Sequence, residues 1–239
     1  MQKSFLAAVI GFAASMAAQA NSNIDQLQQI GQSDFRLLSE DLGAALSYKS
    51  LAPPMTLGLT GFDIGIEATA TRLAHKDVLD QVTSGSAPST LVVPKIHAHK
   101  GLPAGFDIGA SYAAVPSTNV SLWGAELRYA LLEGGLLRPT LSLRGSLSRV
   151  QGVDQLGLST RGLDISIAKG FAVVTPYAGL GKVWVTSTPR NAGLLTEEKF
   201  SLNKIYGGVN LNLGLTNLAF EADRTGDANT YGVKIGFRF

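Results

Sequence analysis

Residues 231–239 alternate strictly between large apolar side chains and small or basic ones, and this pattern restricts the fold more than any other feature of the chain. Alternation with a period of two is typical of a β-strand, because successive side chains point to opposite faces. The same period recurs along residues 56–239. The chain is therefore predicted to be an all-β protein built from antiparallel strands.

Residues 62–71 show how the two faces of such a strand differ. Phe62, Ile64 and Ile66 lie on one face, and Asp63 and Glu67 lie on the other. A soluble β-sandwich shows similar alternation, but charged side chains are unfavourable on the face that builds a sandwich core. In a membrane barrel the apolar face contacts lipid and the charged face lines the lumen. The pattern therefore favours a transmembrane β-barrel.

The terminal strand, with Tyr231, Phe237 and Phe239, resembles the C-terminal strand of Gram-negative outer-membrane β-barrel proteins. The resemblance covers the start of the chain, this strand and the general strand pattern, and it identifies no subfamily. In that superfamily the barrel-assembly machinery recognises the terminal aromatic strand, so the resemblance implies this machinery as a partner. It also implies the bacterial outer membrane as the location, with membrane lipid and lipopolysaccharide as the surroundings.

The start of the chain is typical of an export signal. Lys3 precedes an apolar run over residues 5–14, and a small-x-small cleavage pattern follows at residues 18–20. We expect cleavage near Ala20, which gives a mature chain that begins near Asn21. Since the chain has no cysteine, neither a lipid-anchored start nor a disulfide is available. Beyond residue 20 no stretch approaches the roughly 18 consecutive apolar residues of a transmembrane helix.

Ten strands are predicted after residue 53. They are expected near residues 56–71, 91–100, 104–113, 119–131, 136–149, 160–170, 172–186, 201–213, 217–225 and 229–239. Short turns alternate with longer connections, and in barrels of this class the short turns lie on the periplasmic side. An even number of strands places residue 55 and Phe239 on that same side.

Residues 21–52 differ from the rest of the chain, because apolar residues recur there at spacings of three and four. This spacing predicts a helix that begins at Ser33 as its cap and runs to about Leu42. The helix is expected either to plug the lumen or to lie at the periplasmic mouth. The competing interpretation is an extra strand over Gly43–Lys49, which together with a partner strand upstream would give twelve strands. The predicted organisation is a signal over residues 1–20, a helical segment over 21–52 and a barrel over 53–239.

The alternation assigns a set of polar side chains to the lumen and a set of apolar ones to lipid. The predicted lumen residues are Asp63, Glu67, Asp107, Glu126, Arg128, Arg144, Asp164, Lys182, Asn210, Asn212, Glu221, Asp223, Lys234 and Arg238. The predicted lipid-facing residues are Ile64, Ile66, Leu127, Leu143, Ile165, Val209 and Ile235, between aromatic girdles that include Phe106, Tyr129, Phe220, Tyr112 and Trp123. Opposite charges are expected to pair across the lumen, because unpaired ions are costly where water is scarce.

These residues predict a structural protein, or one that passes small solutes, with a lumen largely filled by side chains. A wide aqueous channel requires roughly 16 to 18 strands. The 20 basic and 18 acidic side chains nearly balance, which implies no nucleic-acid partner. No oligomeric state is predicted.

Two clusters of polar residues are candidate sites of chemistry. His97 and His99 lie two residues apart beside Lys95, but two ligands do not make a metal site, so no metal and no cofactor is predicted. His75, Asp77 and Asp80 lie in the longest loop, with Ser84 and Ser86 following, and such residues can form a base and its orienting carboxylate. No hydrolase motif surrounds either serine, so a lipid-modifying or proteolytic surface enzyme is only the alternative, and no catalytic residue is assigned.

Overall fold

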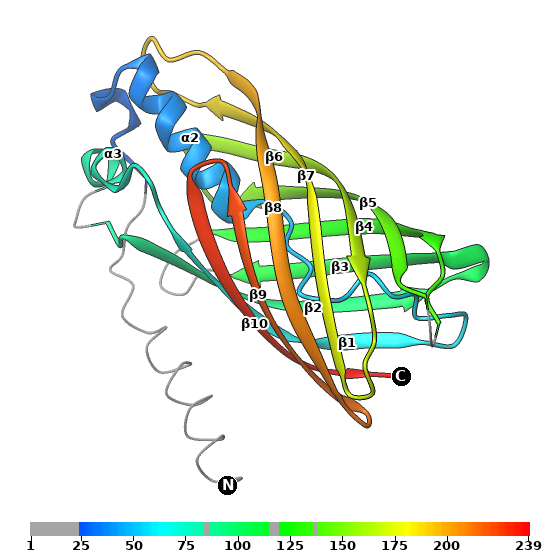
Figure 1. Cartoon of the computed structure of the whole chain (residues 1–239). Coiled ribbons are helices and arrows are strands. Elements are labelled where there is room, and N and C mark those ends of the chain that lie inside the picture. Colours follow the sequence, from blue (N-terminus) through cyan, green and yellow to red (C-terminus); the bar gives the residue numbers. More distant parts are fainter. Residues whose placement is uncertain (1–23, 84–86, 115–119, 136–137) are drawn as a thin grey trace, which may run out of the picture.

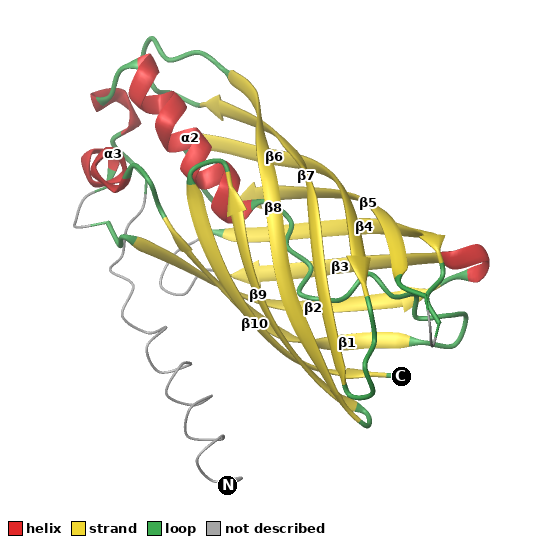
Figure 2. Cartoon of the chain, in the orientation of Figure 1, coloured by secondary structure: helices red, strands yellow, loops and turns green. Residues whose placement is uncertain are grey.

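In the computed structural model, ten antiparallel strands close into a barrel (Figures 1 and 2). The structure describes residues 24–83, 87–114, 120–135 and 138–239, so the predicted signal, Ser84 and Ser86 lie outside the described residues. The strands are β1 (Phe62–Arg72), β2 (Thr90–Gly101), β3 (Phe106–Ala114), β4 (Ser121–Leu132), β5 (Thr140–Gln151), β6 (Leu156–Ala168), β7 (Val174–Pro189), β8 (Glu198–Leu213), β9 (Thr216–Thr225) and β10 (Ala228–Arg238). The prediction of a ten-stranded antiparallel barrel is confirmed.

The wall closes where β1 pairs with β10, which is the seam between the two ends of the barrel sequence. Asp63 lies opposite Arg238 and Arg72 lies opposite Asn229, so the whole length of β1 is paired. At the start of the seam, Phe62 and Phe239 exchange two backbone hydrogen bonds of 2.8 and 3.1 Å. Their rings lie 5.4 Å apart.

The two ends of the barrel differ in their connections. One end, called the short-turn end, holds the start of β1 and Phe239. Its described connecting residues are 102–105, 133–135, 138–139, 169–173 and 214–215. A one-turn 3-10 helix, η3 (Pro103–Gly105), lies in the first of these connections. The other end, called the long-loop end, lies where β1, β3, β5, β7 and β9 end. Its described connecting residues are 73–83, 87–89, 120, 152–155, 190–197 and 226–227.

Apart from η3, the helices of the described residues lie at the long-loop end (Figure 2). They are η2 (Leu27–Gln29), α2 (Gln32–Leu46) and α3 (Lys76–Val82). The predicted N-terminal helix is confirmed, but it is capped by Gly31 and not by Ser33, and it continues to Leu46. Gly43 to Leu46 are helical and residues 47–49 form no strand, so the twelve-stranded alternative is wrong.

No helix of the described residues is long and apolar enough to cross a membrane.

Along the sequence, the chain runs through the lumen of the barrel before it forms the first strand of the wall. Figure 1 shows α2 in blue at the long-loop end and the following segment in cyan, which continues to the opposite end where β1 begins. Residues 47–61 make this passage, and the contacts described below place residues 47–57 inside the lumen.

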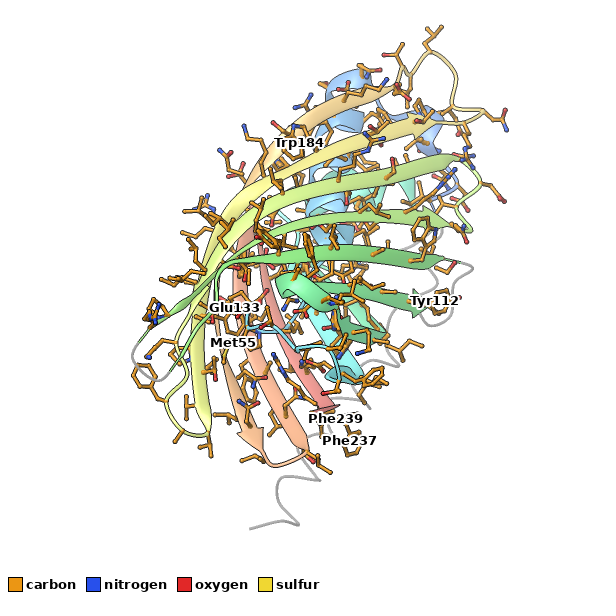
Figure 3. All side chains as sticks on the ribbon, turned by 90° about the vertical axis from the view of Figure 1, so that its right-hand side faces the viewer. Met55, Tyr112, Glu133, Trp184, Phe237 and Phe239 are labelled. Carbon is orange, nitrogen blue, oxygen red and sulfur yellow. The ribbon has the colours of Figure 1, made fainter. Side chains whose placement is uncertain are left out.

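The outer face of the wall is apolar. Ile64, Ile66, Leu127, Leu143, Ile165 and Ile235 are exposed and lie on the outward side of their strands. The aromatic side chains fall near the two ends: Phe237 and Phe239 lie at the short-turn end, and Tyr112, Trp123 and Trp184 lie toward the long-loop end. Figure 3 shows such side chains projecting from the outer face of the wall. The sequence did not single out Trp184 as a member of this set.

Candidate functional site in the barrel lumen

The lumen has an apolar layer toward the long-loop end, and helix α2 fills it. Inward-facing side chains of β4 to β8 form a core with one face of the helix, namely Leu122, Val150, Leu158, Val183, Val185 and Leu202 against Phe35, Leu38, Leu42 and Leu46. Helix and wall approach closely, since a Cβ added at Gly43 would lie 2.7 Å from Val185 Cγ2. Four residues earlier, the Ser39 hydroxyl donates to Ser187 Oγ at 2.8 Å.

Residues 46–57 continue from the helix into a polar layer, where the wall satisfies their backbone groups. Their carbonyl oxygens accept hydrogen bonds from wall side chains: Leu46 from Ser148 (2.8 Å), Lys49 from Lys95 (2.9 Å), Pro53 from Arg128 (3.0 Å), Pro54 from Ser142 (2.7 Å) and Met55 from Arg238 (3.0 Å). The Leu57 N–H donates to Asp107 Oδ1 at 3.1 Å. Because buried carbonyl groups must be paired, these bonds fix the path of the segment.

Two glycines of the wall make room for side chains of this segment. Tyr48 lies against Gly124 and Leu51 lies against Gly232, with 2.5 and 2.7 Å between the nearest side-chain atom and the position a Cβ would take. A larger residue at either position would push the segment from the wall. The abundant glycine of the strands therefore has a packing role at these two positions.

The polar layer is ionic and its charges balance. The acids are Asp63, Glu67, Asp107, Glu126, Asp164, Glu221 and Asp223, and an equal number of cations faces them: Lys49, Lys95, Arg128, Arg144, Lys204, Lys234 and Arg238. The pairs include Lys234 with Asp63 (2.8 Å), Lys95 with Glu67 (3.1 Å) and Arg144 with Asp164 (3.0 Å). Lys49 belongs to the N-terminal segment, and its Nζ lies 2.9 Å from both carboxylate oxygens of Asp223. The wall alone would therefore hold an excess of acids.

The structure places the predicted lumen residues on the inward side of the wall, with the exception of Lys182. Lys182 is exposed and shares the outward side of β7 with Leu180 and Trp184, so its assignment to the lumen is wrong. Asn210 donates to Asn212 at 2.7 Å, near the short-turn end. Sequence reasoning missed Lys49 and Lys204, which are both buried here. Inward alternation in β8 was a usable signal for Lys204.

His97 and His99 also lie in the lumen, beside Asp63. One ligand atom from each of these residues falls within 4.8 Å of the others, which is the kind of group that can hold a metal ion. Asp63 is already engaged, however, because Lys234 Nζ lies 2.8 Å and Arg238 lies 3.8 Å from its Oδ2 atom. A metal ion would have to compete with these two cations. The arrangement therefore favours ion pairing of Asp63 over metal binding.

An apolar outer face and an ionic interior, on a closed wall of antiparallel strands, define a transmembrane β-barrel. Solved structures similar to the chain include the N-terminal β-barrel domain of Pseudomonas aeruginosa OprF, at 14% identity and a TM-score of 0.40, with 76% of this chain and 99% of that chain covered. The outer membrane protein OprG from Pseudomonas aeruginosa is 12% identical, with a TM-score of 0.34 and coverage of 79% and 99%. The KdgM porin is 10% identical, with a TM-score of 0.36 and coverage of 75% and 99%. No family model and no curated protein matches the chain.

In the described part of the loop, no ion pair or hydrogen bond joins the side chains of His75, Asp77 and Asp80, which are the candidate enzyme residues. His75 faces α2, where Asp41 Oδ1 lies 3.4 Å from its Nδ1 atom. Asp80 instead pairs with Lys76 at 2.6 Å. The Lys76 ammonium and the Ala87 N–H hold the pKa of the Asp80 carboxyl below its ordinary value. Asp77 is exposed. Ser84 and Ser86 lie outside the described residues.

Asp41 instead links the loop that follows β1 to helix α2, which fills the apolar layer of the lumen. It accepts hydrogen bonds from the backbone N–H groups of Ala74 (3.1 Å) and His75 (2.7 Å). We expect Asp41→Ala to cost about 1.5 to 3 kcal/mol of unfolding free energy and to speed proteolysis of residues 73–83, because hydrogen bonds to a charged group are lost. Asp77→Ala, its control in the same loop, should change stability by less than about 0.5 kcal/mol. Equal losses in the two variants would contradict this anchoring role.

Proposed function

We propose that the chain is a bacterial outer-membrane β-barrel that its own N-terminal segment holds closed, and that solutes pass only when this segment moves. One observation carries the proposal: residues 46–57 are hydrogen-bonded to inward side chains of the wall along the length of the polar layer. A ten-stranded barrel has a narrow lumen that side chains can largely fill. A helix and an extended segment fill it further.

The charge balance supports the same proposal. Lys49 completes the equality of acids and cations in the lumen, and its partner Asp223 is buried. Withdrawal of the segment would leave Asp223 without this cation and would remove the carbonyl groups that Arg128 and Arg238 bind. The closed state is therefore the stable one, and opening requires another source of free energy.

We further propose an orientation and two kinds of surroundings. The short-turn end faces the periplasm, as it does in bacterial barrels of this class, which places α2 and α3 at the outer surface. The outer face contacts membrane lipid and lipopolysaccharide. Strand β10, with exposed Tyr231, Phe237 and Phe239, is the element that the barrel-assembly machinery recognises.

Single-channel recordings in planar bilayers test closure. We expect the intact protein to show little or no steady conductance, because its lumen is occupied. Deletion of residues 21–50 should produce a stable conductance, since it removes α2 and Lys49 together. Large and stable conductance of the intact protein would contradict the proposal.

A cysteine pair tests the same proposal without deleting any part of the chain. Ser39 Oγ and Ser187 Oγ lie 2.8 Å apart, so sulfur atoms at the same two positions would face each other within reach of a disulfide bond. The chain has no cysteine of its own, so Ser39→Cys with Ser187→Cys forms a unique pair that joins α2 to β7. Any openings of the reduced variant should disappear on oxidation, and the Ser39→Cys single variant should not respond. Openings that persist after oxidation would show that passage does not require the helix to move.

A further inference from the structure

The charged side chains of the wall are sorted by sign between its two faces. Every Asp and Glu within the ten strands lies on the inward side. The charged residues on the outward side are all basic: Arg72, Lys100, Arg149, Arg161, Lys182, Lys199 and Arg224. A soluble surface would mix the two signs. This separation of the two signs therefore indicates that the outer face contacts an anionic partner at some position along the barrel axis.

Three of these cations lie side by side on consecutive strands. Arg149 on β5 is opposite Ser159 on β6, and Arg161 is the next outward residue after Ser159. Arg161 in turn is opposite Trp184 on β7, and Lys182 is the outward residue that precedes Trp184 in the sequence, toward the short-turn end. Residues in this diagonal relation lie about 7 to 8 Å apart, which is within the reach of long side chains. Arg149, Arg161 and Lys182 are called the basic triad below.

The members of the basic triad are exposed and have no acidic partner. No ion pair or hydrogen bond within the described part of the chain engages any of the three side chains. By contrast, Arg224 is paired with Asp227 and Lys199 with Glu197 on the same outer face. Unpaired cations that lie close together repel one another. A bound anion would offset this electrostatic repulsion, which destabilises the protein when no anion is bound.

The triad also lies at the boundary of the apolar band, toward the long-loop end. On the same strands and the same face, the residues toward the short-turn end are Leu143, Leu147, Leu163, Ile165, Ile167 and Leu180, all exposed. Trp123 is opposite Arg149 and Trp184 is opposite Arg161. Tryptophan beside lysine and arginine is typical of the level of lipid headgroups.

We propose that the basic triad binds the phosphate groups of a membrane lipid headgroup in the leaflet at the long-loop end, with the lipid's chains along Leu147, Leu163 and Leu180. Two arginines offer paired N–H donors that match phosphate oxygens, and Lys182 adds a third cation. A headgroup with two separated phosphates fits the spread of the triad over three strands. The site rests on the membrane placement of the barrel, and it holds whether or not the lumen is closed.

Native mass spectrometry of the intact protein in neutral detergent tests this site with three probes. They are diphosphoryl lipid A, the same glycolipid without phosphates, and inorganic phosphate. We expect diphosphoryl lipid A to bind about tenfold or more tighter than the phosphate-free glycolipid, since each cation near a headgroup adds to the attraction. Inorganic phosphate should compete only weakly, because it lacks the chains. Equal binding of the two glycolipids, or full competition by inorganic phosphate, would overturn the proposal.

Matched variants locate the binding on the wall. The variant R149Q/R161Q/K182Q should lose most of the preference for the phosphorylated lipid. The control R72Q/K199Q/R224Q removes an equal outward charge from β1, β8 and β9 and should keep that preference within about twofold. All six side chains are exposed, and folding is checked by the shift in gel mobility on heating. An equal loss in both variants would mean unspecific attraction and would refute the triad as the site. Because conductance is not the readout, this result is independent of the closed-lumen proposal.

Discussion

Replacing Lys49 by Met is expected to lower the unfolding free energy of the barrel by about 3 to 5 kcal/mol, because it leaves a buried charge without its partner. The Lys49 ammonium lies 2.9 Å from both oxygens of Asp223, and the two side chains are only 1% and 2% exposed. Met retains most of the volume of Lys, so the loss reports the charge. Urea titration of the protein in lipid vesicles, followed by tryptophan fluorescence, measures the change.

Two further variants identify the source of this loss. The double variant K49M/D223N removes both charges and should be clearly more stable than Lys49→Met, since no buried charge remains unpaired. Lys199→Met breaks an ion pair whose lysine side chain is 70% exposed, and it should cost no more than about 1 kcal/mol. Should Lys49→Met cost no more than Lys199→Met, the N-terminal segment would not occupy the lumen.

The substitution Ile165→Arg should lower the unfolding free energy by about 2 to 4 kcal/mol, because it places a cation on the outer face of the wall near the middle of the membrane. Ile165 lies on β6 between Leu180 and Leu143 of the neighbouring strands, and all three side chains are exposed on the apolar band. The same unfolding titration in vesicles measures the loss.

Ser159→Arg is the control for depth. Ser159 is on the same strand and the same outward side, opposite Arg149, at the level of the basic triad. An arginine near the membrane interface should lower the unfolding free energy by only about 0 to 1 kcal/mol, because its guanidinium group reaches the lipid headgroups. Similar costs for Ile165→Arg and Ser159→Arg would show that the wall does not cross a membrane at this level.

The wall could be predicted from the sequence because alternation is a local signal. In β1, for example, Ile64 and Ile66 alternate with Asp63 and Glu67, and each strand needs only its own residues to reveal this period. Some predicted strand bounds were wrong. At the short-turn end β1 begins at Phe62 and not at residue 56. At the long-loop end β6 begins at Leu156 and not near residue 160, and β7 continues to Pro189. Inward positions such as Leu158 and Val185 are apolar in this part, whereas outward positions such as Ser159 are polar. The two faces therefore exchange character, and the alternation no longer marks the same side of the strand.

The path of the N-terminal segment could not be predicted, because its determinants are distant in the sequence. Residues 47–57 have no period of their own, and their partners, such as Arg128 and Ser142, lie far along the chain. One signal was available in principle. Leu122 and Leu202 are apolar residues at inward positions, which an empty polar lumen would not contain. They required an apolar helix as a partner.

The prediction that Lys182 faces the lumen is wrong because charge alone does not identify the lumen face. Its neighbours on β7 define the correct face, since Leu180 and Trp184 share its phase and Gly181 and Val183 share the inward one. A lysine can lie on a lipid-facing side when its ammonium group reaches the level of the headgroups. The position of a residue within the alternation of its strand therefore predicts the face better than its residue type does.

The threaded path of the chain also has a mechanical consequence. A pulling force applied to Ile24 from the long-loop side would pass down residues 47–61 and reach the wall at Phe62, at the opposite end of the barrel. The pull on Phe62 would then point back along β1, so the strand would peel away one hydrogen bond at a time. Once the contacts of α2 and residues 46–57 with the wall are broken, the first bonds of the seam to carry that load are the two between Phe62 and Phe239, whose rings are also in contact. Under tension the barrel would open from its seam, and the contacts between Phe62 and Phe239 would resist the separation of β1 from β10.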